Sequence, residues 1–370
     1  MSQSSARPSE TQLLPILQEL LQARLPNDWD FDVLTDRADR DRRVDGVLTV
    51  TAPDSGIARI AIETKASVYP RDAYALSSQL GSLWPASPRP SGRLAAIPGY
   101  DAVLVMTRFL TVRTRDMLKE LGFSYADATG NLRISTRRPA ILLEISGASE
   151  NPWAEDRSLR SLKGPGSAAV VRALLDFKPP YKLRDLAERA NLALGTASRV
   201  VSLLAEEALL TRSGRGPIET VDVDKLVRRW TEDYAMLGSN DNSFFLEPRG
   251  PMATLSALGQ VTDEYAITGS FAAVRRAPIA TPALLAAYVR DVREAADQLN
   301  LKPAPAGGNV VLLSASSELP FLRSWSEGEV KYAALPQVAA DLLTSPGRGP
   351  SEGEALLEWM EANEDAWRRS

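Results

Sequence analysis

Two carboxylates and a lysine in the first half of the chain have the spacing of a site that could hydrolyse a phosphodiester. Glu63 and Lys65 are two positions apart in the apolar run 58–66, so in a β-strand both side chains point to the same face. Asp45 begins the preceding strand-like run, and adjacent strands would bring the three together. Two carboxylates can hold Mg²⁺, which polarises the phosphate and activates water, while the ammonium group stabilises developing negative charge. The alternative is an exposed Glu63–Lys65 pair without a catalytic role.

A second set of residues has side chains suited to double-stranded DNA. In the helical run after Leu194, apolar residues are expected inward and polar ones outward, namely Thr196, Ser198, Arg199 and Ser202. Short hydroxyls and one arginine in the first turns of a helix allow close approach to base edges in the major groove. Such binding requires no cofactor. The alternative is a helical hairpin packed in a larger core, with its arginines merely solvated.

Further basic residues flank this helix. Leu210 to Ile218 has strand-like ends and a glycine-rich tip, with Arg212 and Arg215 near the tip, and Arg184 lies on the polar face of the preceding helical run 183–190. Helix, turn 191–195, second helix and basic hairpin together have the layout of a winged helix-turn-helix. We therefore expect Arg212 and Arg215 to contact phosphate or the minor groove.

The elements that would position Asp45, Glu63 and Lys65 are predicted over residues 11–146. They are helix 11–24, strands 29–34, 44–51 and 58–66, helix 71–83, strand 102–106, helix 112–121 and short strands near Phe123, Leu132 and Ile141. The order helix, three strands, helix, strand predicts an α/β domain.

Elements on either side of the basic hairpin complete the expected DNA-binding part. A helix over 167–177 should precede the two helices of the expected helix-turn-helix, and an amphipathic helix over 224–237 should close the DNA-binding part or dimerise.

In the third segment, 253–368, Gly269-Ser270 follows a strand, as in nucleotidyltransferases. Arg275, Arg276 and Ala277 occupy the stretch where an acidic pair would bind metal. Catalysis there is not expected, and Gly269-Ser270 is interpreted as a turn that lets a helix pack closely.

Charge and composition limit the class of function. The 370 residues include 43 basic and 47 acidic side chains, a net charge of −4, but residues 157–229 contain 14 basic and 8 acidic ones, a net +6. A local positive surface on an acidic protein favours phosphate attraction at one face. Neither cysteine nor histidine is present, which excludes disulfides, serine-histidine triads and the usual zinc sites. No run suggests a membrane span or a signal peptide, so we expect a cytoplasmic protein.

Composition shifts predict an α/β multidomain chain. The expected parts are a disordered tail 1–10, an α/β domain 11–150, a winged helix-turn-helix 160–238 and a C-terminal α/β domain 251–370.

The first domain resembles the PD-(D/E)XK nuclease superfamily through Asp45, Glu63-Thr64-Lys65 and its order of elements, although Val44 stands where that superfamily often has proline. The resemblance implies a restriction-endonuclease-like fold with Asp45, Glu63 and Lys65 catalytic and Asp45, Glu63 and the Thr64 carbonyl on Mg²⁺. It also implies Glu19 as a further metal-site residue and Gln79 as a helix residue facing the cleft.

The rest of the chain resembles AbiEi-like regulators, the antitoxin-type repressors of type IV toxin-antitoxin systems. The resemblance runs over most of 120–365 and is carried by the segments 195–201, 127–131, 268–273 and 337–343 and by Gly347-Arg-Gly-Pro350. It implies operator binding, a cognate toxin or defence protein as partner, and an AbiEi-like C-terminal domain; a homodimer is also compatible.

We therefore expect a sequence-specific DNA-binding transcriptional regulator without catalysis, of the antitoxin type. The rival is a Mg²⁺-dependent endonuclease targeted by the winged helix in a defence or DNA-processing system. A pure protein-interaction scaffold is the third class, and it would show no DNA affinity at low salt.

Overall fold

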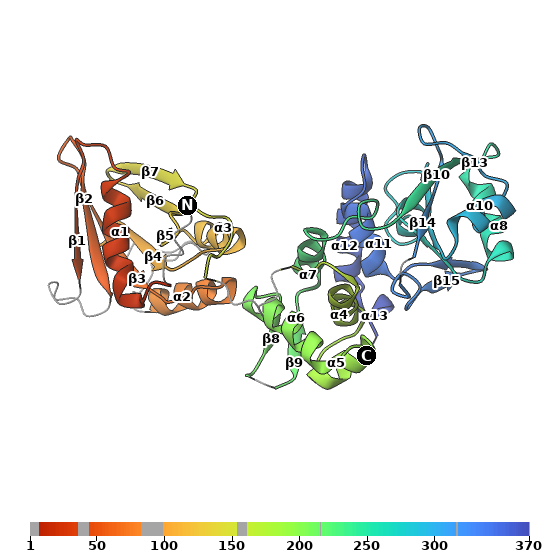
Figure 1. Ribbon diagram of the computed structural model, residues 1–370, viewed down its shortest axis with the longest axis horizontal. Helices are drawn as coiled ribbons and strands as arrows, with labels where there is room; N and C mark the ends of the chain where they lie inside the picture. Colours follow the sequence, from red (N-terminus) through yellow and green to blue (C-terminus); the bar gives the residue numbers. More distant parts are fainter. Residues whose placement is uncertain are drawn as a thin grey trace. The chain divides into compact units, whose positions relative to one another are not determined.

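The computed structural model of the chain describes residues 7–35, 44–82, 99–153, 161–214, 216–315 and 317–369, without the side chains of residues 35 and 78–82. The chain is a mixed α/β protein of two compact units, Met1–Ser158 and Leu159–Ser370 (Figure 1). The second unit contains both the segment expected as a winged helix-turn-helix and the segment after it.

The first unit is built on a sheet whose strands lie side by side in chain order. The outer pairs are antiparallel, whereas β3, β4 and β5 are parallel neighbours joined through helices α2 and α3. The strands are β1 Asp30–Thr35, β2 Gly46–Thr51, β3 Ile57–Thr64, β4 Ala102–Thr107, β5 Ser124–Asp127, β6 Leu132–Arg137 and β7 Ala140–Ile145; the helices are η1 Glu10–Gln12, α1 Leu13–Gln22, α2 Pro70–Ser82 and α3 Val112–Glu120. This order matches the predicted one.

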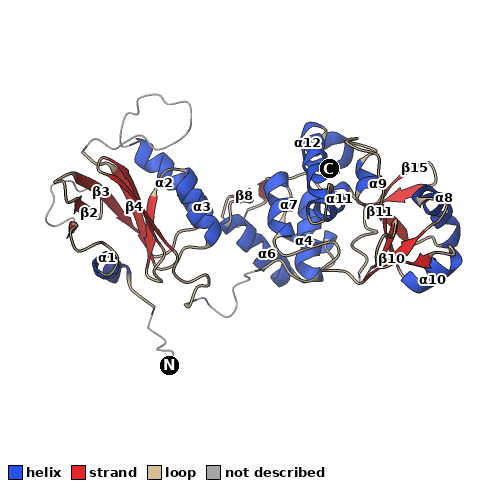
Figure 2. Cartoon of the chain, turned by 90° about the horizontal axis from the view of Figure 1, so that it is seen from above, coloured by secondary structure: helices blue, strands red, loops and turns tan. Residues whose placement is uncertain are grey.

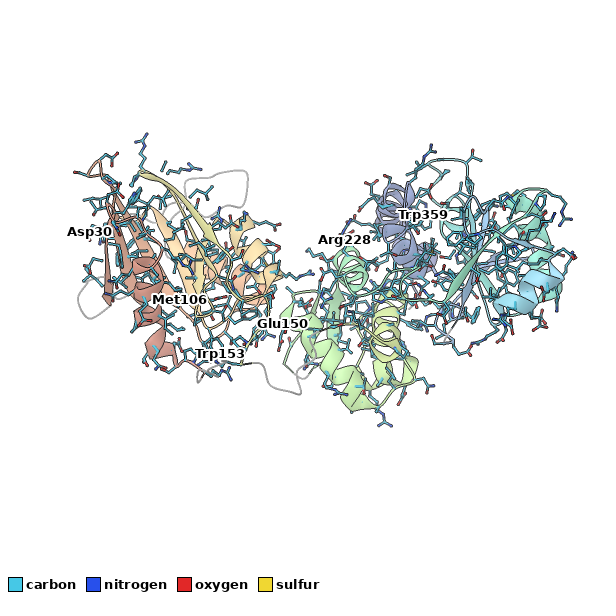
Figure 3. The ribbon with its side chains drawn as sticks, turned by 45° about the horizontal axis from the view of Figure 1, so that its top comes forward. Asp30, Met106, Glu150, Trp153, Arg228 and Trp359 are labelled. Carbon is cyan, nitrogen blue, oxygen red and sulfur yellow. The ribbon has the colours of Figure 1, made fainter. Side chains whose placement is uncertain are left out.

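Alternation along the strands gives this sheet two buried faces. In β3, Ile60 and Ile62 pack on the face that α1 covers through leucines one turn apart, Leu13 and Leu17, because strand side chains alternate with a period of two. Ala61 points to the opposite face, where α2 and α3 pack. Figure 2 shows α1 on one side of the sheet and α2 and α3 on the other, and Met106 lies inside this unit (Figure 3).

The second unit begins with three helices and a β-hairpin. Their order is that of a winged helix, and α7 follows as a closing helix that ends at Thr231, not at Leu237 as predicted. The elements are α4 Pro165–Asp176, α5 Leu183–Arg189, α6 Leu194–Glu206, β8 Leu210–Arg212, β9 Ile218–Val221 and α7 Val223–Thr231. The chain leaves the helix early because the side chains after it turn inward: the Tyr234 hydroxyl donates to the buried Asp341 at 2.6 Å.

The remainder of this unit is a sheet with helices around it. The strand order is β13-β10-β14-β12-β11-β16-β15. The strands are β10 Asn242–Leu246, β11 Tyr265–Thr268, β12 Leu285–Val289, β13 Lys302–Pro303, β14 Val310–Ser314, β15 Trp325–Glu327 and β16 Val330–Tyr332. The helices are α8 Pro251–Val261, α9 Ser270–Ala273, α10 Val292–Gln298, α11 Leu335–Leu343, α12 Gly349–Ala362 and α13 Glu364–Trp367. Gly269 has φ 63° and starts α9, so it is the close turn that the sequence predicted.

One hydrophobic core runs through the whole second unit. Trp230 of α7 belongs to the same buried cluster as Val338 of α11 and Tyr288 of β12. Arg172 of α4 is fully buried and donates to the carbonyls of Leu319 and Leu322 and to the Gln337 side chain. Helices α4 to α7 and the hairpin β8–β9 are therefore packed directly on the C-terminal sheet and helices. Of the helices in the described ranges, none has the length and apolar character needed to cross a membrane.

Candidate nucleic-acid interface

Helices α5 and α6 are the pair for which the sequence predicts a helix-turn-helix. The turn between them contains Asn191 in the left-handed region with φ 53°, a conformation that asparagine adopts more readily than most residues. Leu186 and Ala187 of α5 are buried together with Ala197, Val201 and Leu204 of α6. The apolar spacing in the sequence thus places one face of each helix in the core and leaves the other face of α6 outward.

The outward face of α6 contains the predicted DNA-binding residues. Arg199 is exposed, and Thr196, Ser198 and Ser202 are half-buried. The Arg199 guanidinium donates to the Thr196 hydroxyl at 3.4 Å, which aligns the arginine along the first turns. Leu194 is 52% exposed, and no side chain caps the helix start. The start of α6 therefore presents short side chains, an arginine and backbone N–H groups, all of which suit a DNA groove and its phosphates.

The hairpin after α6 has the form of a wing. Strands β8 and β9 pair antiparallel, with the Thr211 and Thr220 hydroxyls 2.7 Å apart, and Gly214 in the tip has φ 56°. Arg212 is half-buried at the end of β8. The predicted phosphate contact Arg215 lies outside the described residues.

A backbone bridge that sequence reasoning missed fixes the wing to the segment before α5. The Tyr181 amide donates to the Ile218 carbonyl at 3.2 Å, and the Ile218 amide donates back to Tyr181 at 2.9 Å. The bridge adds a third short strand segment to the hairpin, so the hairpin cannot move independently of the helix pair. The only hint in the sequence is an aromatic residue directly after Pro179-Pro180.

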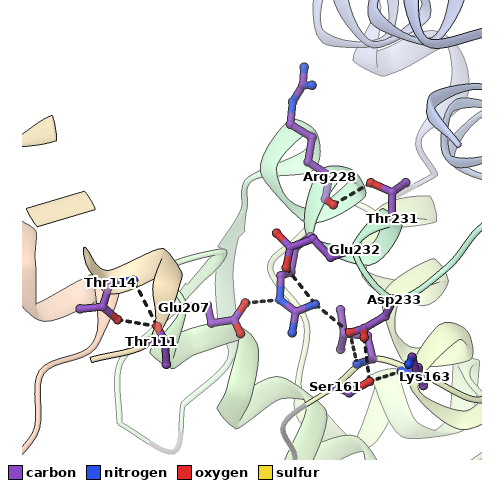
Figure 4. Close-up of polar contacts among 11 residues, drawn as sticks. Thr111, Thr114, Ser161, Lys163, Glu207, Arg228, Thr231, Glu232 and Asp233 are labelled. Atoms are coloured by element: carbon purple, nitrogen blue, oxygen red, sulfur yellow. Dashed lines mark hydrogen bonds and ion pairs between the residues drawn. The ribbon is translucent and has the colours of Figure 1, made fainter. Parts of the chain in front are cut away.

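The far end of α6 is held by a group of charges. Arg229 of α7 donates to Glu207, the residue after α6, at 2.7 Å and to Asp233 at 2.9 Å (Figure 4). Asp233 also accepts from the Ser161 hydroxyl at 2.9 Å and the Leu162 amide at 2.7 Å. Burial alone would raise the pKa of the Asp233 carboxyl, but these three donors hold the pKa below its usual value. The sequence gives no sign of this group because Glu207 and Arg229 are 22 positions apart.

Several basic residues in 157–229 form ion pairs with acidic residues of the same unit. Arg228 forms ion pairs with Asp224 and with Glu354, 126 positions away, and Lys178 pairs with Asp365. Arg172 is buried beside Asp176. The positive surface is consequently smaller than the net +6 of residues 157–229 suggests. The basic residues that remain exposed or half-exposed near α6 include Lys182, Arg184, Arg199 and Arg212; Arg184 is 82% exposed and pairs with Glu188 at 3.1 Å.

The first unit brings three of the predicted nuclease residues together. The β2–β3 register ends at the pair Gly46–Ile62, and the Asp45 amide just before it donates to the Ile62 carbonyl at 3.0 Å. The Thr64 amide and hydroxyl donate to the Asp45 carboxylate at 2.7 and 3.0 Å, and Lys65 lies 2.5 Å from Glu63. The hydrogen bond to Glu63 raises the pKa of Lys65, against the opposing effect of its partial burial, and the charge of Asp45 adds to the increase.

Glu19 does not join this group. Helix α1 packs on the opposite face of the sheet through Leu13, Leu17 and Leu21, and Glu19 is exposed, because the buried leucine stripe turns it outward. The acidic residue that acts on Lys65 from this region is Glu10 of η1, which the sequence analysis did not single out. The Gln79 side chain lies outside the described residues. Within the described part of the chain, no group of three or more acidic residues is placed to hold a metal ion.

The two carboxylates that do converge fit Mg²⁺ in its usual protein setting. That ion keeps several waters and is often held by one or two carboxylates together with substrate phosphates. Asp45 and Glu63 each use one oxygen on a neighbour, Thr64 and Lys65 respectively. One oxygen of each carboxylate is then left for a metal.

Comparison with known proteins found no matching family model, no matching curated protein and no matching solved structure.

Proposed function

We propose that this chain is a sequence-specific, double-stranded DNA-binding transcriptional regulator whose helix α6 enters the major groove. The observation that carries the proposal is the outward face of α6. Arg199 and three short hydroxyl side chains lie there, on a helix fixed at one end by the turn at Asn191 and at the other by Arg229. A rigid helix with short side chains and one arginine can approach base edges closely.

The hairpin supports the same function. The bridge between Tyr181 and Ile218 holds the wing beside the helix pair, so Arg212 is available to phosphates flanking the groove. The side chains and amide groups involved supply these contacts without a cofactor. The AbiEi-like motifs favour a repressor of the antitoxin type, with a cognate toxin or defence protein as partner.

Replacement of Arg199 tests the reading helix. We expect Arg199→Ala to lose about 1–3 kcal/mol of discrimination between a duplex selected by the wild-type protein from a random pool and an unselected duplex, because a base contact disappears. Gel-shift titrations of both duplexes measure the loss. Arg348→Ala, which removes an exposed arginine at the start of α12, is the matched control. Equal discrimination by Arg199→Ala and the wild type would place the recognition surface elsewhere.

The first unit supports a second candidate function, cleavage of DNA by a Mg²⁺-dependent endonuclease. The specific observation is that Asp45, bonded to Thr64, lies near enough to the Glu63–Lys65 pair for its charge to act on Lys65. Asp45 and Glu63 would hold the metal, which when bound polarises the scissile phosphate and activates water. Lys65, kept protonated by Glu63, would stabilise the negative charge that develops on the phosphate.

Plasmid cleavage separates the two candidates. If the first unit is an endonuclease, the full chain with Mg²⁺ or Mn²⁺ converts supercoiled plasmid to nicked or linear DNA, and Asp45→Ala reduces the rate by at least about 100-fold because one of two metal ligands is removed. Glu19→Ala, which removes a carboxylate on the other side of the sheet, should cleave like the wild type. Cleavage that persists in Asp45→Ala would assign the activity to another site or to a contaminant.

A further inference from the structure

The second unit contains a pocket lined by arginines. It has a volume of about 500 Å³ and lies between the end of α4, the segment leading into β15, the start of α11 and the residues around α13. This volume is in the usual range of small-molecule sites. Among the described residues that line it are four arginines and two aspartates, namely Arg276, Arg323, Arg368, Arg369, Asp176 and Asp365.

Both aspartates are already used by other cations. Asp176 accepts from the Arg323 Nε at 2.5 Å and also lies 3.2 Å from the fully buried Arg172. Two guanidinium groups therefore share one carboxylate. Asp365 pairs with Lys178. Neither carboxylate is left to neutralise the other arginines of the pocket.

Two of these arginines have donors left for a ligand. Among the described residues, the terminal nitrogens of Arg323 and the side chain of Arg369 make no hydrogen bond, whereas Arg368 is bound to Glu364 and to the Leu174 carbonyl. Arg323 is 13% exposed and has φ 57°. Left-handed backbone is unfavourable for a residue with a side chain, so it is retained where the surroundings require that direction.

The other wall of the pocket is apolar. Leu335, Pro336 and Trp367 line it, and the Trp367 indole is fixed by a hydrogen bond to the Met360 carbonyl at 2.9 Å. Trp325 also borders the pocket, but Tyr332 and Arg276 lie against its ring with centroid distances of 4.5 and 4.0 Å. Trp367 is thus the better surface for the carbon part of a ligand.

We propose that this pocket binds a phosphorylated small molecule and that its binding weakens the attachment of α6 to DNA. A phosphate monoester has a charge of about −1.5 to −2 at neutral pH and three acceptor oxygens, which matches two arginine forks without a free carboxylate. Arg–phosphate pairs of this kind are among the stronger polar contacts. The volume left beyond the phosphate would accept an organic group against Trp367.

Phe177 connects the pocket to the helix-turn-helix; this step rests on the proposed DNA-binding function. The Arg323 guanidinium lies 5.0 Å from the centre of the Phe177 ring, and Arg189 of α5 lies 4.1 Å from the same ring. Arg189 is also near the Tyr181 ring, and Tyr181 anchors the wing. A phosphate that draws Arg323 toward the pocket removes one of the two cations that hold Phe177, which loosens α5 and the wing.

Calorimetric titration of the full chain with inorganic pyrophosphate and with adenosine 5′-monophosphate tests the site directly. We expect Arg323→Gln and Arg369→Gln each to weaken binding by about tenfold or more, because each removes charge-assisted hydrogen bonds. Arg323→Lys keeps the charge and guards against a folding defect, and Arg348→Gln should bind like the wild type. No binding of either probe, or equal binding by both glutamine variants and the wild type, would overturn the proposal.

A second titration tests regulation. At matched ionic strength, saturating pyrophosphate should weaken binding of the selected duplex several-fold in the wild type and in Arg348→Gln, but not in Arg369→Gln. Arg323→Gln lacks one of the two cations on Phe177, so it should bind the duplex more weakly than the wild type with or without pyrophosphate. If Arg369→Gln loses DNA affinity without any ligand, the pocket binds the DNA backbone and the small-molecule proposal fails. Pyrophosphate binding by a chain that shows no DNA affinity would instead retain the pocket and overturn both its regulatory role and the proposed function.

Discussion

At the scale of single residues, Asp233 shows how one carboxylate can connect the end of helix α6 to the segment before α4. It accepts hydrogen bonds from Arg229, from the Leu162 amide and from the Ser161 hydroxyl. Arg229 in turn holds Glu207 at the end of α6. Removal of the Asp233 charge leaves Arg229, 6% exposed, without part of its compensation, which is costly for a buried cation.

Asp233→Asn should therefore destabilise the second unit by about 1–3 kcal/mol near neutral pH, because charge-assisted hydrogen bonds are removed. The folded-state pKa of Asp233 is below its usual value of 3.8, so its contribution to stability is present above that value and disappears as the pH falls through the lower folded pKa. Urea unfolding of the wild type and the variant between neutral pH and pH 3 measures both effects.

The pH dependence distinguishes this charge effect from a packing defect. The difference in unfolding free energy between the two proteins should shrink as the pH falls from 3.8 through the lower folded-state pKa of Asp233, below which both have a neutral side chain. A difference that stays constant over the whole range would mean that the carboxylate is not the cause. Glu232→Gln, one position earlier and 60% exposed, is a suitable control and should change stability little.

Residue types predicted part of each candidate site. Glu63 and Lys65 pair as the two-residue spacing along a strand predicts, and Asp45 bonds to Thr64 because β2 and β3 are neighbouring strands. Glu19 was predicted through the resemblance alone, which does not contain the direction of the α1 leucine stripe that leaves it exposed. Glu10 was missed because the short helix η1 shows no periodic pattern of its own.

At the scale of elements, helices α5 and α6 were predictable because their apolar spacing is regular. Helices α5 and α6 begin within one residue of the predicted positions, and the glycines at 214 and 216 indicated the hairpin tip. The bridge from Tyr181 to Ile218 and the end of α7 at Thr231 depend on partners 37 and 107 positions away, respectively. Local periodicity contains no information about such pairings.

The proposed role of the hairpin β8–β9 is to bind phosphate through Arg212 and Arg215. Arg212→Ala combined with Arg215→Ala should weaken binding to all duplexes alike and reduce the slope of log K against log salt by about 2, about 1 for each arginine that no longer neutralises a phosphate. Fluorescence anisotropy between 50 and 300 mM salt, on the order of the usual working range, gives this slope. An unchanged slope, or a weakening confined to the selected duplex, would contradict phosphate binding by the wing.

At the scale of the whole molecule, the polar stretch 238–251 predicted a boundary, but both sides of it contribute to one compact unit. Composition shifts mark exposed loops, and loops occur inside compact units as well as between them. Arg172 shows the difference. It is fully buried by carbonyl groups about 150 positions away, and nothing near Arg172 in the sequence indicates this burial.

This shared core predicts how fragments behave. Residues 159–370 alone should unfold in a single cooperative transition and keep the duplex discrimination of the full chain, because the core is contained within them. A fragment of residues 159–238 should show no cooperative transition, since Arg172 and Trp230 would lose the groups that bury them. Differential scanning calorimetry measures both. A folded, DNA-binding 159–238 fragment would show that the winged helix is independent.

The backbone of Arg369, close to the end of the described chain, holds the segment between α4 and α5. Its amide donates to the Asp176 carbonyl at 2.9 Å, and its carbonyl accepts from the Lys178 amide at 2.6 Å. These two hydrogen bonds fix the start of the segment that leads from α4 to α5. A peptidase that cuts between Trp367 and Arg368 would remove both hydrogen bonds without touching α6. On the proposed function, trimming at this point should weaken DNA binding, and affinity tags fused on that side belong behind a flexible spacer.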